Sequence, residues 1–349
     1  MPMTLEDVAR VAGVSRSTVS RVINHDPFVK ESTRQAVSEV LQKLNFQPNL
    51  AARGLAAGRT SVLGLVIPMG VGALFTDPFF PLYIQGVTSA CNALDYSVML
   101  WLAEPEYERR TIRQILYNGL VDGVIVASTL TDDPIIEALA ESSLPFFLTG
   151  RYPVRDQVNF VDVENRAGAL VAVRHLFGCG YTRIATISGP QNMIAGSDRY
   201  QGYRDAFAEH GLEPDPRLNC RADFTEKGGY LAMTALLGQL PEAVFAASDA
   251  MALGALRAIQ EAGLRVPQDI GLVGFDDIPA AANALPALTT VRQPIQRPGA
   301  AAAEALIDII QHPRAQPCKI LLPVELIVRS SCRGLHQTII SSLEKFDFK

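Results

Sequence analysis

Residues 4–24 read Thr-Leu-Glu-Asp-Val-Ala-Arg-Val-Ala-Gly-Val-Ser-Arg-Ser-Thr-Val-Ser-Arg-Val-Ile-Asn, and this stretch decides the first part of the fold. Apolar residues recur in it at helical spacing, which predicts two short amphipathic helices with a tight turn between them. Thr4 is placed to cap the first helix, and Asp7 can complete a capping box with it. Gly13 tolerates a positive φ at the end of that helix, and Ser15 can cap the second one.

The second helix carries a polar face that fits the major groove of DNA. This face consists of Arg16, Ser17, Ser20, Arg21 and Asn24. Arginines, hydroxyls and amides pair with base edges and phosphates, so the pattern is typical of a helix-turn-helix. A helical hairpin with an ordinary solvated face has the same periodicity, and these residues alone leave both interpretations open.

The residues that follow predict a third helix and a short linker. Apolar side chains at helical spacing indicate a helix over residues 31–44, which can close a three-helix core. The next residues, 45–55, read Asn-Phe-Gln-Pro-Asn-Leu-Ala-Ala-Arg-Gly-Leu. Over this region the chain resembles the lactose-repressor (LacI/GalR) family of bacterial transcription regulators. The residues that carry the resemblance are Thr4-Leu5, Asp7-Val8-Ala9, Ala12-Gly13-Val14-Ser15, Thr18-Val19-Ser20-Arg21-Val22, Asn24, Thr33-Arg34, Pro48-Asn49, Ala52-Arg53 and Leu55.

The resemblance implies which residues contact DNA. Arg21 would read a guanine in each half-site, while Arg16 and Ser17 would set the neighbouring preference. Residues 49–56 are implied to form a hinge helix that folds only on DNA, where Leu55 wedges into the minor groove and bends the duplex. The DNA-binding residues implied in this way are Thr4, Ser15, Arg16, Ser17, Thr18, Arg21, Asn24, Thr33, Asn49, Ala52 and Leu55.

Length and charge are consistent with a DNA-binding head on a larger body. The chain has 349 residues, of which 48 % are hydrophobic and 19 % charged, and this length predicts two or three domains. Its net charge of −5 is unevenly distributed, because residues 1–59 carry eight Lys or Arg and five Asp or Glu, whereas the remainder carries 23 and 31. A basic head on an acidic body is typical of a protein that presents one end to DNA.

Several classes of protein are disfavoured by the sequence. The first residues contain no basic region followed by an apolar run, and no 18-residue apolar stretch occurs, so we expect a cytoplasmic protein without a membrane span. The five cysteines and five histidines are scattered without ligand spacing, which predicts reduced thiols, no metal site and no cofactor. No phosphate loop, nucleophile elbow or complete Gly-x-Gly-x-x-Gly turn follows a predicted strand, which argues against an enzyme.

From residue 61 onward, apolar strands alternate with amphipathic helices, which predicts doubly wound parallel sheets covered on both faces. A first α/β unit is expected from strands at 61–68, 97–101, 122–127 and 145–149 and from helices near 80–94 and 106–119. A second unit, beginning near Val161, is expected from strands at 182–188, 219–223, 243–247 and 270–274 and from helices near 165–178, 199–210, 227–239 and 250–262.

This half of the chain resembles the type I periplasmic-binding-protein fold that the same family uses as its sensor. The resemblance implies two lobes with a cleft between them, and three passages of the chain between the lobes, near 160–163, 290–294 and 320–324. The expected domains are a helix-turn-helix domain over 1–46, a hinge and linker over 47–60, a ligand-binding and dimerisation domain over 61–333 and a tail over 334–349. Lobe one is expected over 61–160 and 293–321, and lobe two over 161–291 and 322–333.

Ligands of doubly wound folds bind at the carboxyl ends of the strands, so the loops there contain the candidate ligand-binding residues. Arg199, Phe224 and Asp276 match family positions that bind or stack on the ligand, and many relatives have Asn where Ser248 stands. An arginine facing an aspartate, with aromatic rings beside them, suits a sugar, because the charged groups bind hydroxyls and the rings cover C–H patches. The candidate ligand-binding residues are Phe79, Phe80, Arg151, Arg199, Phe224, Ser248 and Asp276. Arg151 is also placed for a salt bridge, which is the simpler role.

These features predict a homodimeric repressor of sugar-utilisation genes that a small sugar releases from a palindromic operator. The main alternative is a regulator that responds to a nucleobase or other metabolite as a corepressor. An enzyme or a solute-binding protein on the same α/β scaffold is a weaker alternative, because neither accounts for residues 1–59. The tail has an apolar repeat of about two heptads, shorter than a coiled coil generally needs, and therefore favours a dimer over a tetramer.

Overall fold

The structure is a computed structural model that describes residues 3–23, 26–46, 59–67, 74, 77–102, 119–127, 130–131 and 133–334. It divides into two compact units, residues 1–60 and residues 61–349. The hinge segment 49–56, the helix expected near 106–119 and the tail after residue 334 lie outside the described residues or nearly so. Within the described part, no helix has the length and apolar character needed to cross a membrane.

The described part of the first unit contains three helices, as the sequence predicts. These are α1 (Leu5–Ala12), α2 (Arg16–Ile23) and α3 (Glu31–Lys43). Val8, Val19 and Val37, one from each helix, are fully buried against one another in a small core. This core is possible because the apolar side chains recur at helical spacing on each element.

The caps predicted for the first two helices are confirmed. Thr4 and Asp7 form a reciprocal capping box at the start of α1, and Gly13 ends that helix with a φ of 68°. The Ser15 hydroxyl accepts a hydrogen bond of 3.2 Å from the backbone N–H of Thr18, which caps α2. Local sequence therefore determines where both helices begin and where the turn between them lies.

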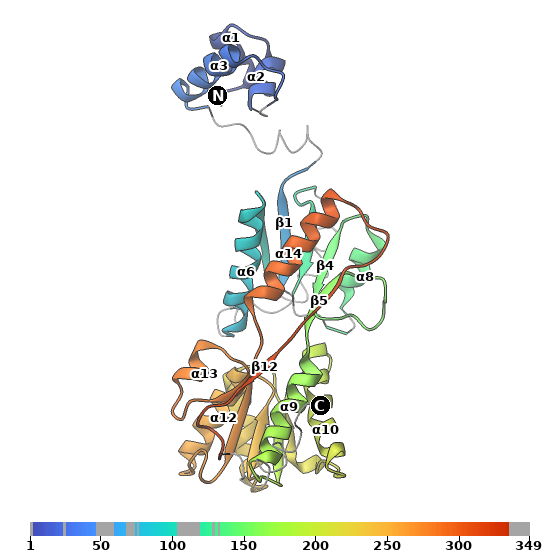
Figure 1. Cartoon of the computed structure of the whole chain (residues 1–349), viewed down its shortest axis with the longest axis vertical. Helices are drawn as coiled ribbons and strands as arrows, with labels where there is room; N and C mark the ends of the chain where they lie inside the picture. The colour runs from blue at the N-terminus through green and yellow to red at the C-terminus, as the bar shows by residue number, and fades with distance from the viewer. Residues whose placement is uncertain are drawn as a thin grey trace, which may run out of the picture. The chain divides into compact units, whose positions relative to one another are not determined.

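The second unit has two lobes, each built on a six-stranded sheet (Figure 1). In lobe one the strand order is β11-β5-β4-β3-β1-β2, and all pairs are parallel. These strands are β1 (Val62–Ile67), β2 (Ser97–Leu102), β3 (Gly123–Val126), β4 (Phe146–Thr149), β5 (Phe160–Val163) and β11 (Lys319–Leu322). The helices in the described part of lobe one are α6 (Phe79–Ala93), α8 (Pro134–Glu141) and α14 (Gln296–Gln311).

Lobe two repeats this arrangement with the order β12-β10-β9-β8-β6-β7, in which only the β10–β12 pair is antiparallel. Its strands are β6 (Ile184–Ser188), β7 (Asn219–Arg221), β8 (Ala243–Ala246), β9 (Gly271–Asp276), β10 (Thr289–Arg292) and β12 (Glu325–Ile327). Its helices are α9 (Asn165–Gly178), α10 (Ile194–Glu209), the 3-10 turn η1 (Pro216–Leu218), α11 (Glu226–Leu237), α12 (Asp249–Glu261) and α13 (Pro279–Asn283).

Buried strands with helices on both faces explain the continuous apolar runs in the sequence. On β3, Val124 and Val126 pack in the cluster that contains α8 residues, whereas Ile125 between them packs in the cluster that contains α6 and α14 residues. On β8, Phe245 packs with residues of α9 and α10, and Val244 packs with residues of α11 and α12. Successive side chains point to opposite faces of a strand, so both faces must be apolar.

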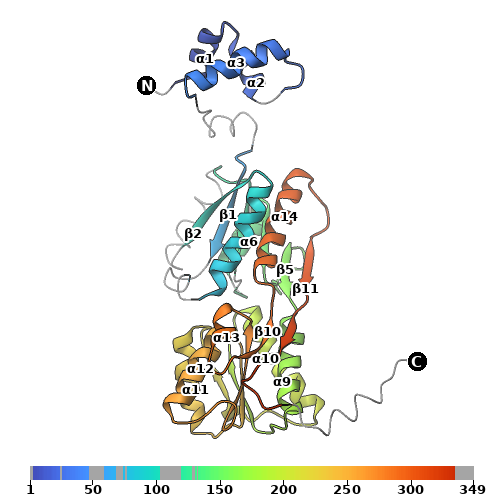
Figure 2. The same cartoon turned by 60° about the vertical axis from the view of Figure 1, so that its left-hand side comes forward.

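The chain passes between the lobes three times, and Figure 2 shows the connections side by side. The passages lie after β5, between β10 and α14, and between β11 and β12, as the family resemblance implies. One expectation is wrong: the second α/β unit, which forms lobe two, does not begin near Val161. Residues 160–163 form β5, which pairs with β4 and β11 inside the sheet of lobe one.

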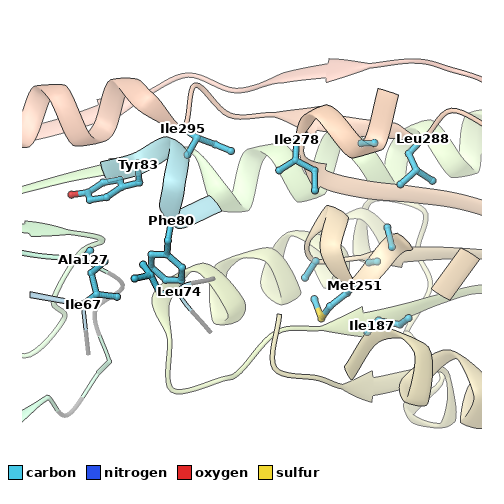
Figure 3. Packing of buried hydrophobic residues seen from close by; sticks show 14 of the residues in the cluster. Ile67, Leu74, Phe80, Tyr83, Ala127, Ile187, Met251, Ile278, Leu288 and Ile295 are labelled. Carbon is cyan, nitrogen blue, oxygen red and sulfur yellow. The ribbon is translucent and has the colours of Figure 1, made fainter. Parts of the chain in front are cut away.

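The largest apolar cluster draws on both lobes (Figure 3). From lobe one it includes Ile67, Phe80 and Tyr83, and from lobe two it includes Met251 and Ile278. These side chains are at most 2 % exposed. The cluster therefore continues from the core of one lobe to the core of the other.

Two further differences from the sequence analysis concern elements near the cleft. Helix α10 begins at Ile194, so Arg199 lies in its second turn and does not open the helix. Strand β9 is not the last strand of its lobe, because β10 pairs beside it and β12 follows. Residues 289–327 carry four elements that the apolar pattern did not predict individually, namely β10, α14, β11 and β12.

Candidate DNA-binding and ligand-binding sites

The second helix of the first unit presents a polar, exposed face opposite its buried one. Val19 and Val22 are 0 % and 4 % exposed, and they hold α2 against the rest of the unit. The side chains of Arg16 and Arg21 are each 68 % exposed, and Ser17 is exposed beside them. The helix therefore offers two guanidinium groups and a hydroxyl to a large partner.

Both arginines form only surface ion pairs in the free protein. Arg16 Nε lies 3.1 Å from a Glu6 carboxylate oxygen, and Arg21 Nε lies 3.7 Å from an Asp26 carboxylate oxygen. Exposed pairs of this kind are worth about 0–1 kcal/mol, so exchanging a carboxylate for a phosphate or a base edge costs little.

The other predicted DNA-binding residues are placed in several ways. The hydroxyls of Ser17 and Thr18 each lie 2.8 Å from the Ser15 hydroxyl at the start of α2. Thr4 is exposed at the start of α1, and Thr33 is half-buried in the first turn of α3. The remaining predictions lie outside the described residues: Asn24, Asn49, Ala52 and Leu55.

In the second unit, six of the seven predicted ligand-binding residues line one cavity between the lobes. Phe79 and Phe80 reach it from lobe one. Those that reach it from lobe two are Arg199, Phe224, Ser248 and Asp276. The empty space between the lining atoms is about 840 Å³, which includes open solvent at its mouth. The seventh residue, Arg151, is not part of the lining.

Arg199 is the only cation among the described residues that line the cavity, and it is 5 % exposed. Its Nε donates to the Asn165 side-chain oxygen at 2.9 Å, and its Nη1 donates to the Ala247 carbonyl at 2.7 Å. Nη1 also lies 3.2 Å from an Asp276 carboxylate oxygen. Burial lowers the pKa of Arg199, and the neighbouring carboxylates oppose that shift. The guanidinium is held in one orientation, which leaves Nη2 as the donor without a recorded partner in the described part of the chain.

Aromatic rings support this guanidinium. The ring of Phe275 lies 3.7 Å from the Arg199 guanidinium carbon, and the ring of Phe224 lies 5.8 Å from it. Phe224 has a φ of 66°, which is unusual for an aromatic residue. Its ring occupies the space beside Gly189, where a Cβ would approach the ring to 2.3 Å. Gly189 thus allows the ring of Phe224 to lie at the cavity.

Asp276 is held at the end of β9 in a strained backbone conformation. Its φ is 121°, and that of Asp277 is 58°. Asp249 stabilises this turn, because one of its carboxylate oxygens accepts the Ile278 N–H at 3.0 Å and the other accepts the Thr290 hydroxyl at 2.6 Å. Strained residues of this kind persist only where the surroundings determine them, and they are common at ligand sites.

The buried carboxyl groups around this turn resist ionisation. Burial raises the pKa of Asp276 to about 6, although Arg199 lowers it. Burial also raises the pKa of Asp249, and the Asp276 charge adds to that effect. A carboxyl with a pKa near 6 is still mostly ionised at pH 7.5, so Asp276 can accept hydrogen bonds there.

Ser248 and Arg151 have structural partners. The Ser248 hydroxyl accepts the Met251 N–H at 3.2 Å and so caps α12 at the edge of the cavity. Arg151, in the loop after β4, lies 3.4 Å from Asp162 of its own lobe and forms an ion pair with Asp198 of lobe two. Arg151 therefore joins the two lobes beside the cavity, which agrees with its simpler expected role as an ion-pairing residue.

Five polar residues line the cavity that the sequence analysis did not select: Asp77, Thr149, Asp162, Asn165 and Gln293. A signal for Asp77 was present, because it follows the first strand in the stretch that contains Phe79. Asp162 was missed because the second α/β unit was expected to begin near Val161. Gln293 was missed because it follows β10, which was not predicted as a strand. Among the residues that the structure describes, no group of three or more His, Cys, Asp or Glu could hold a metal ion.

A helix-turn-helix unit with an exposed basic face, followed by a two-lobed body with a polar cavity, defines a ligand-responsive DNA-binding regulator. Comparison with known proteins agrees. Residues 4–49 match the model for bacterial regulatory proteins of the lacI family, and residues 173–332 match a periplasmic binding protein-like domain.

Whole-chain relatives give the family. The regulator CelR of Thermobifida fusca is 40 % identical over 94 % of this chain and 98 % of its own length. The ribose operon repressor of Escherichia coli strain K12 is 35 % identical over 94 % of this chain and 99 % of its own length. The chain belongs to the lacI family of bacterial transcription regulators, and it is a DNA-binding protein rather than an enzyme.

Solved structures show the same architecture. A lac repressor dimer bound to operator and an anti-inducer superposes with a TM-score of 0.85 at 28 % identity, covering 96 % of this chain and 100 % of that one. A complex of CelR with cellobiose has a TM-score of 0.75 at 38 % identity, covering 94 % and 99 %. The predicted fold class is confirmed.

Proposed function

We propose that this protein represses genes for sugar use and that a small sugar, bound in the cavity between the lobes, releases it from a palindromic operator. The observation that carries the proposal is the buried Arg199–Asp276 pair in a cavity that also contains exposed faces of Phe79 and Phe224. Hydroxyl groups of a sugar can bond to the charged pair, and its C–H faces can stack on the rings. A relative crystallised with cellobiose and a relative that represses a ribose operon support a sugar as the effector.

The residues proposed to bind the effector are those that line the cavity. Arg199 would donate from Nη2, Asp276 would accept from a hydroxyl, and Phe224 would cover an apolar face of the ring. Phe79 and Phe80 would contact the ligand from lobe one, and Ser248 would lie at the margin. Arg151 would act through the Asp162 and Asp198 carboxylates and not by direct contact.

We propose that a homodimer, acting in the cytoplasm, binds DNA through two copies of α2. Arg21 would read a guanine in each half-site, with Arg16 and Ser17 beside it, and Thr4, Ser15, Thr18, Asn24 and Thr33 would contact the backbone or adjacent bases. The hinge within 47–60, with Asn49, Ala52 and Leu55, would contact the operator centre. Residues 61–333 would form the ligand-binding and dimerisation domain.

Effector binding would act on the operator through the relative orientation of the lobes. A ligand held by both lobes favours one orientation, and it can shift the equilibrium only by its differential affinity for the two states. The coupling free energy is typically about 1–3 kcal/mol, and operator DNA must weaken inducer binding by the same factor.

The test combines a thermal-shift panel with operator binding. A sugar that stabilises the protein should weaken its binding to an operator selected from random DNA. The control is Asp276→Ala, which should remain folded and dimeric, bind operator and lose the response to the sugar. If the stabilising ligand is a nucleobase that strengthens operator binding, the protein is a corepressor-dependent regulator and the proposal is wrong.

A further inference from the structure

We infer that the cleft rejects ligands with negative charge, so that the effector is an uncharged sugar and not a sugar phosphate or a sugar acid. The inference rests on the proposed function, because it concerns the effector of the same cavity. The charges that line the cavity, and the hydrogen bonds that those charges already make, support it.

Carboxylates outnumber cations in the described cavity lining. Asp77 and Asp162 line it from lobe one, Asp276 lines it from lobe two, and Arg199 is the one cation among them. Asp162 and Asp276 are 6 % and 7 % exposed, so bulk water screens their charges poorly. Arg151, which is not part of the lining, pairs with Asp162 but also with Asp198, so it does not reverse this balance. An anionic ligand would enter a space in which negative charge exceeds positive charge.

The positive charge of Arg199 is already balanced within the protein. Two of its three nitrogens bond to Asn165 and to the Ala247 carbonyl, and the Asp276 carboxylate lies beside it. A site for a buried phosphate or carboxylate usually provides uncompensated arginines or lysines and several convergent donors. Arg199 is the only positively charged donor in the described lining, and Nη2 is its one nitrogen without a recorded partner there.

Asp77 adds negative charge to the lobe-one side of the cavity. One of its oxygens accepts the Phe79 N–H at 3.0 Å, and the other has no recorded hydrogen-bond partner in the described part of the chain. Asp77, Asp276 and Arg199 line the same cavity. Burial raises the pKa of Asp77 and Arg199 opposes that shift, while burial and the Asp77 charge both raise the pKa of Asp276. A carboxylate only accepts hydrogen bonds, so it needs a ligand group that donates.

A sugar hydroxyl fits between these groups better than an anion does. A hydroxyl can donate to the free oxygen of Asp77 and accept from Nη2 of Arg199, because it has both functions. A phosphate monoester carries a charge of about −1.5 to −2 at pH 7, so it is repelled by Asp77 and Asp276. The preference for an uncharged sugar over an anionic one therefore follows both from the donors and acceptors in the cavity and from its charge.

Helix N-termini at the cavity could attract an anion, because their backbone N–H groups and dipoles favour negative charge. The N-terminus of α6 is already used by the Asp77 carboxylate, and that of α12 is capped by Ser248. The start of α10, at Ile194, also lines the cavity and has no side-chain cap. The first turns of α9 and α14 contribute Asn165 and Pro298 to the lining, and these helices also have no side-chain cap. These N-termini favour an anion, and titration with anionic ligands weighs them against the carboxylates.

The experiment is calorimetric titration of the full-length protein with matched pairs of ligands at constant ionic strength. The pairs are cellobiose and its 6-phosphate, ribose and ribose 5-phosphate, and glucose with glucose 6-phosphate and glucuronate. The best uncharged sugar should bind at least 100-fold more tightly than its anionic counterpart, which corresponds to about 2.8 kcal/mol at 1.4 kcal/mol per tenfold.

A variant tests whether Asp77 causes the discrimination. In Asp77→Asn the side-chain oxygen can still accept the Phe79 N–H, while the negative charge is lost. The gap between the uncharged sugar and its phosphate should narrow at least fivefold, mainly through tighter binding of the phosphate. Asp95→Asn removes the same charge from an exposed position after α6 that does not line the cavity, and it should leave the gap unchanged.

The outcomes separate this inference from the proposed function. A phosphate or acid that binds as tightly as its uncharged counterpart overturns the inference and leaves the sugar assignment intact. An unchanged gap in Asp77→Asn overturns the role given to this residue. If no sugar or sugar derivative binds, the sugar assignment is wrong and the inference falls with it.

Discussion

Replacing Arg199 should damage the protein far more than replacing its ion-pair partner Asp276. The two side chains form a buried pair at 3.2 Å, yet their surroundings differ. Arg199 attracts Asp162 and Asp249 as well as Asp276, whereas Asp276 has this one arginine and faces the negative charge of Asp77. Arg199→Met keeps similar bulk without charge, and Asp276→Asn keeps the shape of the carboxyl.

The magnitude follows from what each change leaves behind. Removing one partner of a buried ion pair typically costs about 3–5 kcal/mol, because the other charge stays uncompensated. Arg199→Met should reach that range, since it also leaves the Ala247 carbonyl and the Asn165 amide oxygen without their donor. Asp276→Asn should cost no more than about 1–2 kcal/mol, because Arg199 retains two hydrogen bonds and the attraction of other carboxylates.

The loss of stability in Arg199→Met should depend on pH, and its direction follows from the pKa of Asp276. The pKa of Asp276 is raised from 3.8 to about 6, so the folded state binds more protons than the unfolded state between these values. The free energy of unfolding therefore rises as the pH falls through this window. Without Arg199 the pKa of Asp276 rises further. For each additional pKa unit, the stability lost by Arg199→Met becomes smaller at low pH by about 1.4 kcal/mol.

Urea unfolding of both variants and the wild type at pH 7.5 and pH 5.5 measures these quantities. Arg204→Met is the matched control, because Arg204 is exposed on the same helix and should change stability by less than about 0.5 kcal/mol. Equal losses in Arg199→Met and Asp276→Asn would refute the reasoning. A deficit in Arg199→Met that is independent of pH would also refute it, because the carboxylates would then not be its cause.

Further predictions concern DNA reading, helix packing and capping. Arg21→Ala should weaken binding to a selected operator by about 1–3 kcal/mol and binding to random DNA much less, and equal losses in a mobility-shift titration would make Arg21 a phosphate contact only. Gly254→Ala should destabilise the second unit by about 1–3 kcal/mol or more, because a Cβ there would lie 1.9 Å from the Glu226 carbonyl oxygen. Gly238→Ala, whose nearest atom lies at 3.8 Å, is its control in the same denaturation assay. Thr4→Ala should lower the melting temperature of the first unit through loss of about 0.5–2 kcal/mol of capping, and an unchanged value would mean that the capping box contributes nothing.

Much of the DNA-binding unit could be predicted from the sequence, because its determinants are local. Caps and turns depend on contacts within three or four residues, as the Thr4–Asp7 box and the positive φ of Gly13 show. Helical periodicity also predicted which valines would be buried, and Val8, Val19 and Val37 are all fully buried. The family resemblance then gave Arg199, Phe224 and Asp276 as a group, and the structure places all three at one cavity.

The tertiary structure alone decided which further residues meet at that cavity. Asp77 and Gln293 are separated by more than 200 residues, and neither belongs to a pattern that predicts their approach. Residues 160–163 were interpreted as the start of the second α/β unit, because an apolar run does not show which sheet it joins. The pairing of β5 with β11, which lies far along the chain, places it in the sheet of lobe one. Burial, pKa and charge balance depend on distances between segments that are remote in sequence, so the sign of the charge around the cavity is a property of the folded chain alone.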